Sequence, residues 1–178
     1  MVTLILGGAR SGKSRYALEL AARHVRPAFV ATAEPLDDEM RDRIRHHREE
    51  REESCFTLEE PVDLAGALGR LPDGTGIAIV DCLTVWLGNL VHRRGAEGLS
   101  GNLEDFGEVA AFLGVIDDPP CPVVVVSNEV GLGGVSDNAL ARTFTDLLGR
   151  LNQKVAARAQ RVVLLISGLP LVLKGEPE

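Results

Sequence analysis

Closely spaced cysteines, long apolar runs and an excess of positive charge are all missing from this sequence. Its three cysteines, Cys55, Cys82 and Cys121, form no close pair and no metal-ligand spacing. We therefore expect reduced, partly buried thiols with no disulfide and no zinc site. No apolar run approaches the roughly 20 residues needed to cross a bilayer. The opening stretch MVTLILGGAR is interrupted by glycine and charge too soon for a signal peptide, so we expect a cytoplasmic protein without a membrane span.

The charge balance is acidic, because 26 aspartate and glutamate residues stand against 19 lysine and arginine residues, for a net charge of -7. A surface of this sign repels a phosphate backbone, which argues against nucleic acid as a partner. Any site for an anionic ligand must therefore be a local feature. The length of 178 residues, 45% of them hydrophobic, predicts a single domain spanning residues 1–178.

Five short, continuously apolar runs are typical of strands buried on both faces of a parallel sheet. They are residues 2–6, 28–32, 77–83, 123–127 and 162–167. Stretches with helical spacing are found at 13–24, 37–53, 61–70, 84–94, 103–115 and 137–160. This alternation predicts a doubly wound α/β domain with a mainly parallel sheet and helices on both faces. The segment LPLVLK can add an antiparallel edge strand, although its proline weakens that expectation.

The strongest motif is GGARSGKS, Gly7 to Ser14, which fits G-x-x-x-x-G-K-[ST] between a predicted strand and a predicted helix. Its glycines let successive backbone N–H groups point at phosphate oxygens, and the following helix adds its positive N-terminal end. Lys13 would neutralise the β and γ phosphates, and the Ser14 hydroxyl would bind Mg²⁺. A purely structural glycine turn is the alternative. We predict a nucleoside triphosphate site in a domain of the P-loop NTPase type (RecA-like).

Polar residues end two further predicted strands. Asp81 closes the run IAIVD, where a carboxylate can hold Mg²⁺ directly or through water; a helix cap for the following residues is the alternative. The segment SNEVG lies at the same edge of the sheet, where ligands of open α/β folds bind. Asn128 and Glu129 are therefore site candidates, with a polar turn as the alternative. We interpret Trp86 as a core residue rather than a base-stacking platform.

Two histidines lie within the charged run RIRHHREER, residues 43–51. On a helix that begins near Asp37 or Asp38, one stripe consists of Met40, Ile44, His47 and Arg51. His46 points elsewhere, onto a charged face with Asp42, Arg43 and Glu50, and we interpret it as a surface residue. For His47 the stripe alone leaves a packing or surface role open beside a catalytic one.

Six blocks of the sequence resemble, in the expected order, one enzyme family. They are GGARSGKSRYALELA, LDDEMRDRIRHHREER followed by FTLEEP, IVDCLTVWLGNL, SNEVGLGGV, LARTFTDLLGRLNQKVA and ISGLPLVLK. Over nearly its whole length the chain is similar to the bifunctional adenosylcobinamide kinase / adenosylcobinamide-phosphate guanylyltransferase of cobalamin biosynthesis. In that family one protein phosphorylates adenosylcobinamide. It then transfers GMP from GTP to the new phosphate through a guanylylated histidine, releasing pyrophosphate and forming adenosylcobinamide-GDP.

The resemblance implies roles for particular residues. The family pattern R-I-x-x-H-x-x-x-R coincides with residues 43–51 and selects His47, the histidine on the helical stripe. The implied nucleotide contacts come from Gly7, Gly8, Ala9, Arg10, Ser11, Gly12, Lys13, Ser14, Ala31, Thr32, Ala33, Arg48, Glu49, Glu50, Arg51, Glu59 and Asp81. Glu59 can accept two N–H groups of guanine, which would explain a preference for GTP.

Three positions depart from the family pattern. Phe56 stands in place of a tryptophan, Ser136 in place of a proline and Thr145 in place of an arginine. The first keeps an aromatic contact. The other two put in doubt the details of the loop after Gly131 and a salt link, but not the chemistry. The resemblance also implies a homo-oligomer, with a trimer as the candidate form.

We therefore expect an enzyme that takes adenosylcobinamide, its phosphate, GTP and ATP as substrates, and Mg²⁺ as cofactor. Lys13 and His47 are its expected catalytic residues, and Ser14 and Asp81 its expected metal ligands. Two rival functions remain: a P-loop kinase for another small molecule, without guanylyl transfer, and a non-catalytic nucleotide-binding switch. The sequence leaves open the preferred phosphoryl donor, the corrinoid docking site and whether both activities are kept.

Overall fold

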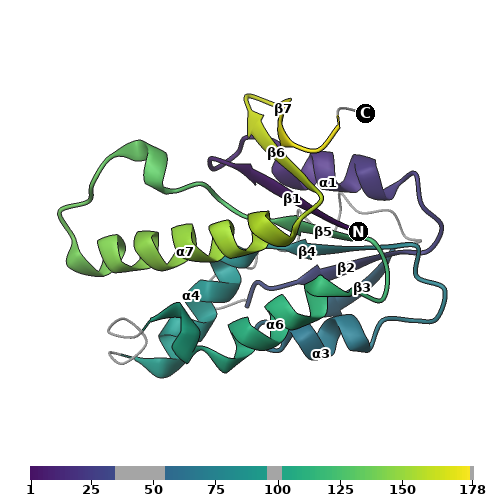
Figure 1. The fold of residues 1–178 in the computed structure, drawn as a ribbon, viewed down its shortest axis with the longest axis horizontal. Helices are drawn as coiled ribbons and strands as arrows, with labels where there is room; N and C mark the ends of the chain where they lie inside the picture. The colour runs from purple at the N-terminus through teal and green to yellow at the C-terminus, as the bar shows by residue number, and fades with distance from the viewer. Residues whose placement is uncertain (35–54, 96–101, 177–178) are drawn as a thin grey trace.

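The fold is built on one seven-stranded sheet with the strand order β3-β2-β4-β5-β1-β6-β7 (Figure 1). The computed structural model describes residues 1–34, 55–95 and 102–176. Strands β1 to β6 run parallel, and β7 pairs antiparallel with β6 at one edge. The predicted helix over 37–53 lies outside the described residues, and so do His46 and His47.

The strands confirm the predicted mainly parallel sheet. Their bounds are β1 Val2–Gly7, β2 Pro27–Ala31, β3 Phe56–Glu59, β4 Ile77–Asp81, β5 Val123–Val126, β6 Arg161–Ile166 and β7 Leu169–Lys174. Every residue of β1 and β5 is buried, which explains why these strands read as continuous apolar runs. Strand β7 confirms the expected antiparallel edge strand, and its proline is tolerated because it lies at the edge.

Strand β3 was not predicted, and this part of the sequence analysis was wrong. The strand is only four residues long, and three of them are exposed. It pairs with β2 alone and forms the opposite edge of the sheet from β7. A short, mostly exposed edge strand gains little from an apolar run, so its sequence carries no strong strand signal.

The described helices fall where the helical spacing predicts them. Their bounds are α1 Lys13–Ala21, α3 Leu64–Gly69, α4 Leu83–Arg94, α6 Gly107–Asp117 and α7 Ala139–Arg158. Two short 3-10 turns span η1 Leu103–Asp105 and η2 Gly131–Gly133. Helix α3 begins later than predicted because the Asp63 carboxylate caps it, accepting the Gly66 N–H at 2.8 Å. Within the described residues, no helix has both the length and the apolar character to cross a membrane.

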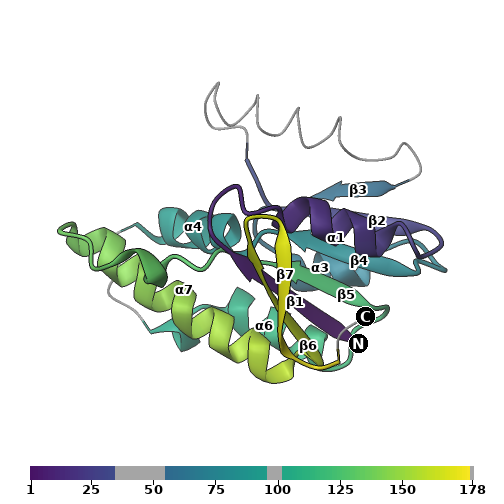
Figure 2. The same ribbon diagram turned by 90° about the horizontal axis from the view of Figure 1, so that it is seen from above.

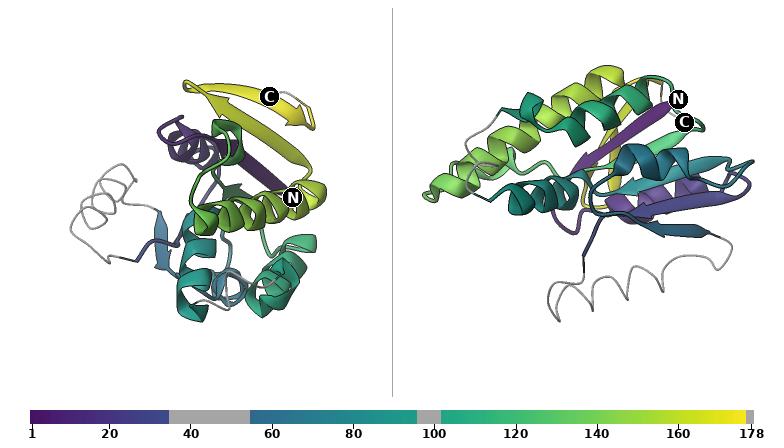
Figure 3. Two further views of the ribbon diagram at one scale, coloured as in Figure 1. Left: turned by 90° about the vertical axis from the view of Figure 1, so that its left-hand side faces the viewer. Right: turned by 90° about the horizontal axis from the view of Figure 1, so that it is seen from below.

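Two hydrophobic cores lie on the two faces of the sheet, because successive strand residues point to opposite sides. Leu4 and Val80 pack on the face covered by α3, α4, α6 and α7. Ile5 and Ile79 pack on the other face, where α1 lies (Figure 2). The coloured ribbons of Figure 3 show the same layers from two further sides. The chain therefore buries both faces of its central strands.

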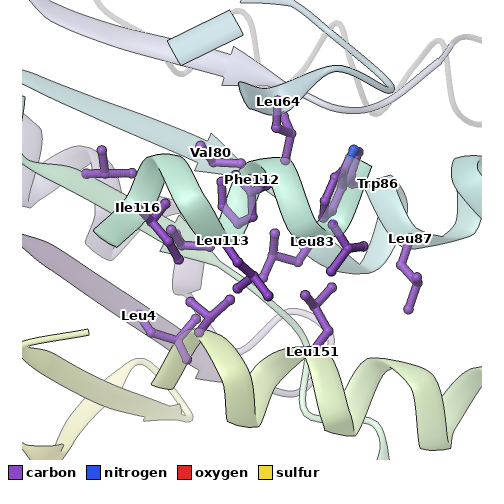
Figure 4. Close-up of a cluster of buried hydrophobic side chains, with 14 of the residues drawn as sticks. Leu4, Leu64, Val80, Leu83, Trp86, Leu87, Phe112, Leu113, Ile116 and Leu151 are labelled. Atoms are coloured by element: carbon purple, nitrogen blue, oxygen red, sulfur yellow. The ribbon is translucent and has the colours of Figure 1, made fainter. Parts of the chain in front are cut away.

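The larger core is centred on two aromatic side chains. Trp86 of α4 and Phe112 of α6 meet edge to face with their ring centroids 5.3 Å apart (Figure 4). The Trp86 indole N–H donates to the carbonyl of Val62 at 2.7 Å, so its single polar group is satisfied. Both side chains are completely buried. Trp86 is therefore a core residue, as the sequence analysis interpreted it.

Replacing Phe112 with alanine should lower the free energy of unfolding by about 3–5 kcal/mol, because it removes a fully buried ring and leaves a cavity. Urea denaturation followed by circular dichroism measures this change. The matched control is Phe56→Ala on β3, whose side chain is 44% exposed and should cost about 1 kcal/mol or less. Equal losses for the two variants would contradict the assignment of the core.

Candidate functional site

The turn between β1 and α1 has the geometry of a phosphate-binding loop. Strand β1 ends at Gly7, and α1 begins at Lys13 directly after Gly12. Arg10 and Gly12 both have positive φ, at 56° and 95°. When right-handed and left-handed backbone conformations alternate, successive N–H groups converge on one point. The N-terminal end of the helix adds its positive partial charge there. The loop therefore has a backbone geometry suited to binding an anion.

Lys13 lies across this loop. Its side chain is almost buried, with 8% of the residue exposed, and Nζ donates a hydrogen bond to the carbonyl of Gly8 at 2.6 Å. Burial lowers the pKa of Lys13 from its ordinary value. An ammonium held here by the loop itself is in place to meet a phosphate as a point charge.

Ser14, the next residue of α1, contacts Asp81 at the end of β4. The Ser14 hydroxyl donates to Oδ2 of Asp81 at 2.7 Å. The alternative role of Asp81 as a helix cap does not hold, since the N-cap of α4 is Cys82. A serine hydroxyl and a carboxylate side by side are oxygen ligands of the kind Mg²⁺ prefers, so these two residues fit that ion.

The Cys82 thiol next to Asp81 and the metal-ligating residues of the described chain bear on which chemistry this site can perform. Burial raises the pKa of the Cys82 thiol to about 12, so this thiol stays protonated and is a poor nucleophile. In the described part of the chain, no group of three or more His, Cys, Asp or Glu side chains could hold a metal ion. Mg²⁺ commonly takes one or two protein oxygens together with phosphate oxygens and water.

Three candidate residues lie in register across neighbouring strands. Ala31 of β2 is paired with Glu59 of β3 on one side and with Asp81 of β4 on the other. Neighbouring strands are spaced by about 4.8 Å, which puts the backbones of Glu59 and Asp81 about 10 Å apart at the same edge. Glu59 is exposed. The edge thus carries a carboxylate near the loop and a second one further along.

Thr32 follows β2 and is completely buried. Its hydroxyl donates to the carbonyl of Cys82 at 2.9 Å and accepts the Cys82 N–H at 2.8 Å. The hydroxyl is thus fully engaged with the backbone next to Asp81. Thr32 therefore ties the residue after β2 to the residue after β4.

Asn89 is a functional candidate that the sequence analysis missed. It lies on α4, is buried, and its Nδ2 donates to the carbonyls of Thr32 at 2.8 Å and Pro61 at 3.2 Å. These bonds hold together the segments that follow β2 and β3, next to Ala31 and Glu59. The sequence carries no signal for this role, because a single asparagine in an amphipathic helix is not a motif.

The structure brings the segment of Asn128 and Glu129 beside the phosphate loop. The Glu129 N–H donates to the carbonyl of Gly7 at 3.1 Å, and the Asn128 N–H donates to the hydroxyl of Thr84 at 2.9 Å. Both contacts are made by the backbone N–H groups of Asn128 and Glu129, not by their side chains. The remaining candidates, His47 and Arg48 to Arg51, lie outside the described residues.

The chain is similar to known proteins over nearly its whole length. Residues 3–173 match the family described as Cobinamide kinase / cobinamide phosphate guanyltransferase. The chain is 43% identical over 178 residues to the bifunctional adenosylcobalamin biosynthesis protein CobP of Pseudomonas aeruginosa, covering 99% of each chain. It is 37% identical to the bifunctional adenosylcobalamin biosynthesis protein CobU of Salmonella typhimurium, covering 98% of this chain and 100% of that protein.

Solved structures resemble the fold at much lower identity. One, from a structural study of PH0250 of Pyrococcus horikoshii, has a TM-score of 0.56 at 10% identity, covering 99% of this chain and 87% of that one. An ATPase of a bacterial type III secretion system has a TM-score of 0.55 at 12% identity, covering 96% of this chain and 56% of that one. These likenesses concern the fold alone and agree with a RecA-like P-loop domain. Because the match extends over nearly the whole sequence, the chain belongs to the cobinamide kinase / cobinamide phosphate guanyltransferase family.

Proposed function

We propose that this protein phosphorylates adenosylcobinamide and then transfers GMP from GTP to adenosylcobinamide phosphate, giving adenosylcobinamide-GDP and pyrophosphate. The observation that carries the proposal is the cluster of Lys13, Ser14 and Asp81 around the phosphate loop, in a chain that matches this family over residues 3–173. The cluster supports triphosphate chemistry, and the family supports the corrinoid substrate.

In the kinase step, positioning and neutralisation of charge provide most of the catalysis. The loop amides and Lys13 hold the phosphates of the donor nucleotide in line with the substrate hydroxyl. Ser14 and Asp81 would hold Mg²⁺, which when bound neutralises developing phosphate charge. The hydroxyl oxygen attacks the γ-phosphorus, the bond to the β-phosphate oxygen breaks, and the hydroxyl proton passes to solvent.

In the transferase step, we propose neutral His47 as the nucleophile. Its ring nitrogen forms a bond to the α-phosphorus of GTP while the bond to the β-phosphate oxygen breaks and pyrophosphate leaves. A phosphate oxygen of adenosylcobinamide phosphate then attacks the same phosphorus and releases His47. Arg48 and Arg51 would stabilise charge on the transferring group. A histidine of ordinary pKa, about 6.5, is mostly neutral near pH 7.5.

Glu59 is proposed to read the guanine base. It is exposed at the end of β3, about 10 Å along the sheet edge from Asp81. That spacing suits a nucleotide whose phosphates lie on the loop and whose base lies further along the edge. The carboxylate can accept the N1–H and the exocyclic N–H of guanine together, whereas adenine offers no such pair.

We also propose that residues 1–178 form one domain that acts in the cytoplasm as a homo-oligomer, such as a trimer. One sheet with two cores contains all the described strands, which supports the single domain. The oligomer rests on the family resemblance. A kinase without transferase activity would need only the loop and Asp81, and it would form no covalent GMP adduct.

Lys13→Ala should lower kcat/KM of both reactions by about 100-fold or more, because both use the same point charge on the triphosphate. Coupled assays of ATP-dependent phosphorylation and of pyrophosphate release measure the two losses. The control is Lys154→Ala on α7, which removes only an exposed ion pair with Glu104. Near-normal turnover of Lys13→Ala in either assay would contradict a shared triphosphate site.

Glu59→Gln should weaken GTP binding by about tenfold or more and leave ATP binding nearly unchanged, since a charge-assisted pair is worth about 1.5–3 kcal/mol. Equilibrium titration of the variant with each nucleotide gives the two ratios, and ATP is the internal control. Equal losses for both nucleotides would mean that Glu59 has another role.

His47→Asn should abolish labelling by GTP that carries label on its α-phosphate, because the variant lacks the nucleophilic nitrogen. Intact mass measurement should show one added GMP on the parent protein and none on the variant. Phosphorylation of adenosylcobinamide should survive at a measurable rate. The control, His46→Asn, should keep labelling within a few fold. Labelling lost at His46 and kept at His47 would show that the other histidine is the nucleophile.

A further inference from the structure

The turn between β6 and β7 packs against the phosphate loop, although the two are far apart in sequence. The Gly168 N–H donates a hydrogen bond to the carbonyl of Ser11 at 2.9 Å. A Cβ placed on Gly12 would come within 3.3 Å of the Gly168 Cα, so the two glycine backbones are in contact. Figure 1 shows the yellow hairpin beside the purple strand β1 that leads into the loop.

Pairing between β1 and β6 brings the turn to this place. Gly7, the last residue of β1, is in register with Leu165 of β6. A Cβ on Gly7 would meet the Leu165 carbonyl oxygen at 2.6 Å, which no side chain would allow. The hairpin then turns through Ser167 and Gly168, with φ angles of 52° and 82°. The loop is thus held against the hairpin both where it begins and where it enters α1.

The hydrogen bond from Gly168 fixes the orientation of one loop peptide. The bond between Ser11 and Gly12 is trans, so its C=O and its N–H point in opposite directions. Because the Ser11 carbonyl is directed to the Gly168 N–H, the Gly12 N–H is directed away from the hairpin. Backbone N–H groups at the N-terminus of a helix are groups that bind phosphate oxygens.

We propose that Gly168 is a positioning residue for the triphosphate: its N–H turns the Ser11–Gly12 peptide so that the Gly12 N–H points at a phosphate oxygen. Gly168 does not itself contact the nucleotide. The proposal rests on the proposed function only in that the loop binds a polyphosphate. It goes beyond that function because it assigns part of the phosphate site to a hairpin that no phosphate-loop motif includes.

Only a residue tolerant of left-handed backbone can serve at this position. With φ at 82°, a β-branched side chain would be strained whatever the space around it. A Cβ on Gly168 would also lie 3.4 Å from the flexible end of Arg15, which can move aside. Asparagine tolerates this backbone region far better than valine and keeps the N–H. Comparing valine with asparagine at residue 168 therefore distinguishes an effect of backbone conformation from an effect of side-chain size.

Ser11 adds an independent sign that the loop is arranged in advance for an anion. Its hydroxyl is buried and has no hydrogen-bond partner among the described residues. A buried hydroxyl of this kind is costly unless a ligand or water satisfies it. The carbonyl of the same residue is already engaged by Gly168. The backbone of Ser11 is thus held while its hydroxyl can still donate to a phosphate oxygen.

The test measures binding of inorganic tripolyphosphate with Mg²⁺ by isothermal titration calorimetry, below the thermal midpoint of each variant. Gly168→Val should raise the Kd about tenfold or more, because a hydrogen bond to a charged phosphate is misdirected. The Kd values for ATP and GTP should rise by the same factor, since both nucleotides present the same triphosphate to the loop. Gly168→Ala should give a smaller rise, and Gly168→Asn should restore binding to within about threefold.

The matched control is Gly95→Val, at the end of α4 with φ at 59° and no atom of the described residues within 4 Å of its Cβ position. It also places a β-branched residue at a positive φ, but away from the loop, and should bind tripolyphosphate like the parent. If Gly168→Val does not fold, the comparison of Gly168→Ala with Gly168→Asn still decides the matter. Parental binding by a folded Gly168→Val or Gly168→Ala, or equal weakening in the Gly95 control, would overturn the proposal. The probe needs no corrinoid, so its outcome is independent of the proposed activity.

Discussion

The parallel arrangement of the six strands from β1 through β6 is the constraint on which the rest of the structure depends. It brings the carboxyl ends of these strands to one edge of the sheet, where ligands of open α/β folds bind. Gly7, Ala31, Glu59 and Asp81 all lie at or next to strand ends at that edge. Residues from four separate parts of the chain can therefore contribute to one site without any long loop.

Buried hydrogen bonds make this edge rigid. Thr32 and Asn89 are both buried, and each bonds to backbone groups of other segments. A buried polar group that loses its partner costs about 1–3 kcal/mol, so these contacts favour one arrangement strongly over its alternatives. The same argument applies to Lys13, whose ammonium is held on the Gly8 carbonyl. The ends of β2 and β4 and the side chain of Lys13 are thus held in place by contacts within the protein.

The sequence predicts the features that follow from local pattern and misses those that depend on distant contacts. Buried strands appear as apolar runs, and Gly7 to Ser14 follow a motif whose geometry is local, so both could be found. Strand β3 was not predicted because an exposed edge strand needs no apolar run. The roles of Asn89 and Gly168 arise from contacts with residues far along the chain, which no spacing rule reveals. The role of His47 stays a prediction.

The central place of β1 has a consequence for how the chain reaches its fold. Its neighbours in the sheet are β5 and β6, so Val2 pairs with Val123 and Thr3 with Arg161. During synthesis, β1 therefore stays unpaired until β5 has been made, and it lacks its second neighbour until β6 has been made. Contacts this distant in sequence are slow to form and leave a strand open to wrong partners. Synthesis speed and chaperone supply should thus affect the yield of this protein more than that of a helical bundle of equal size.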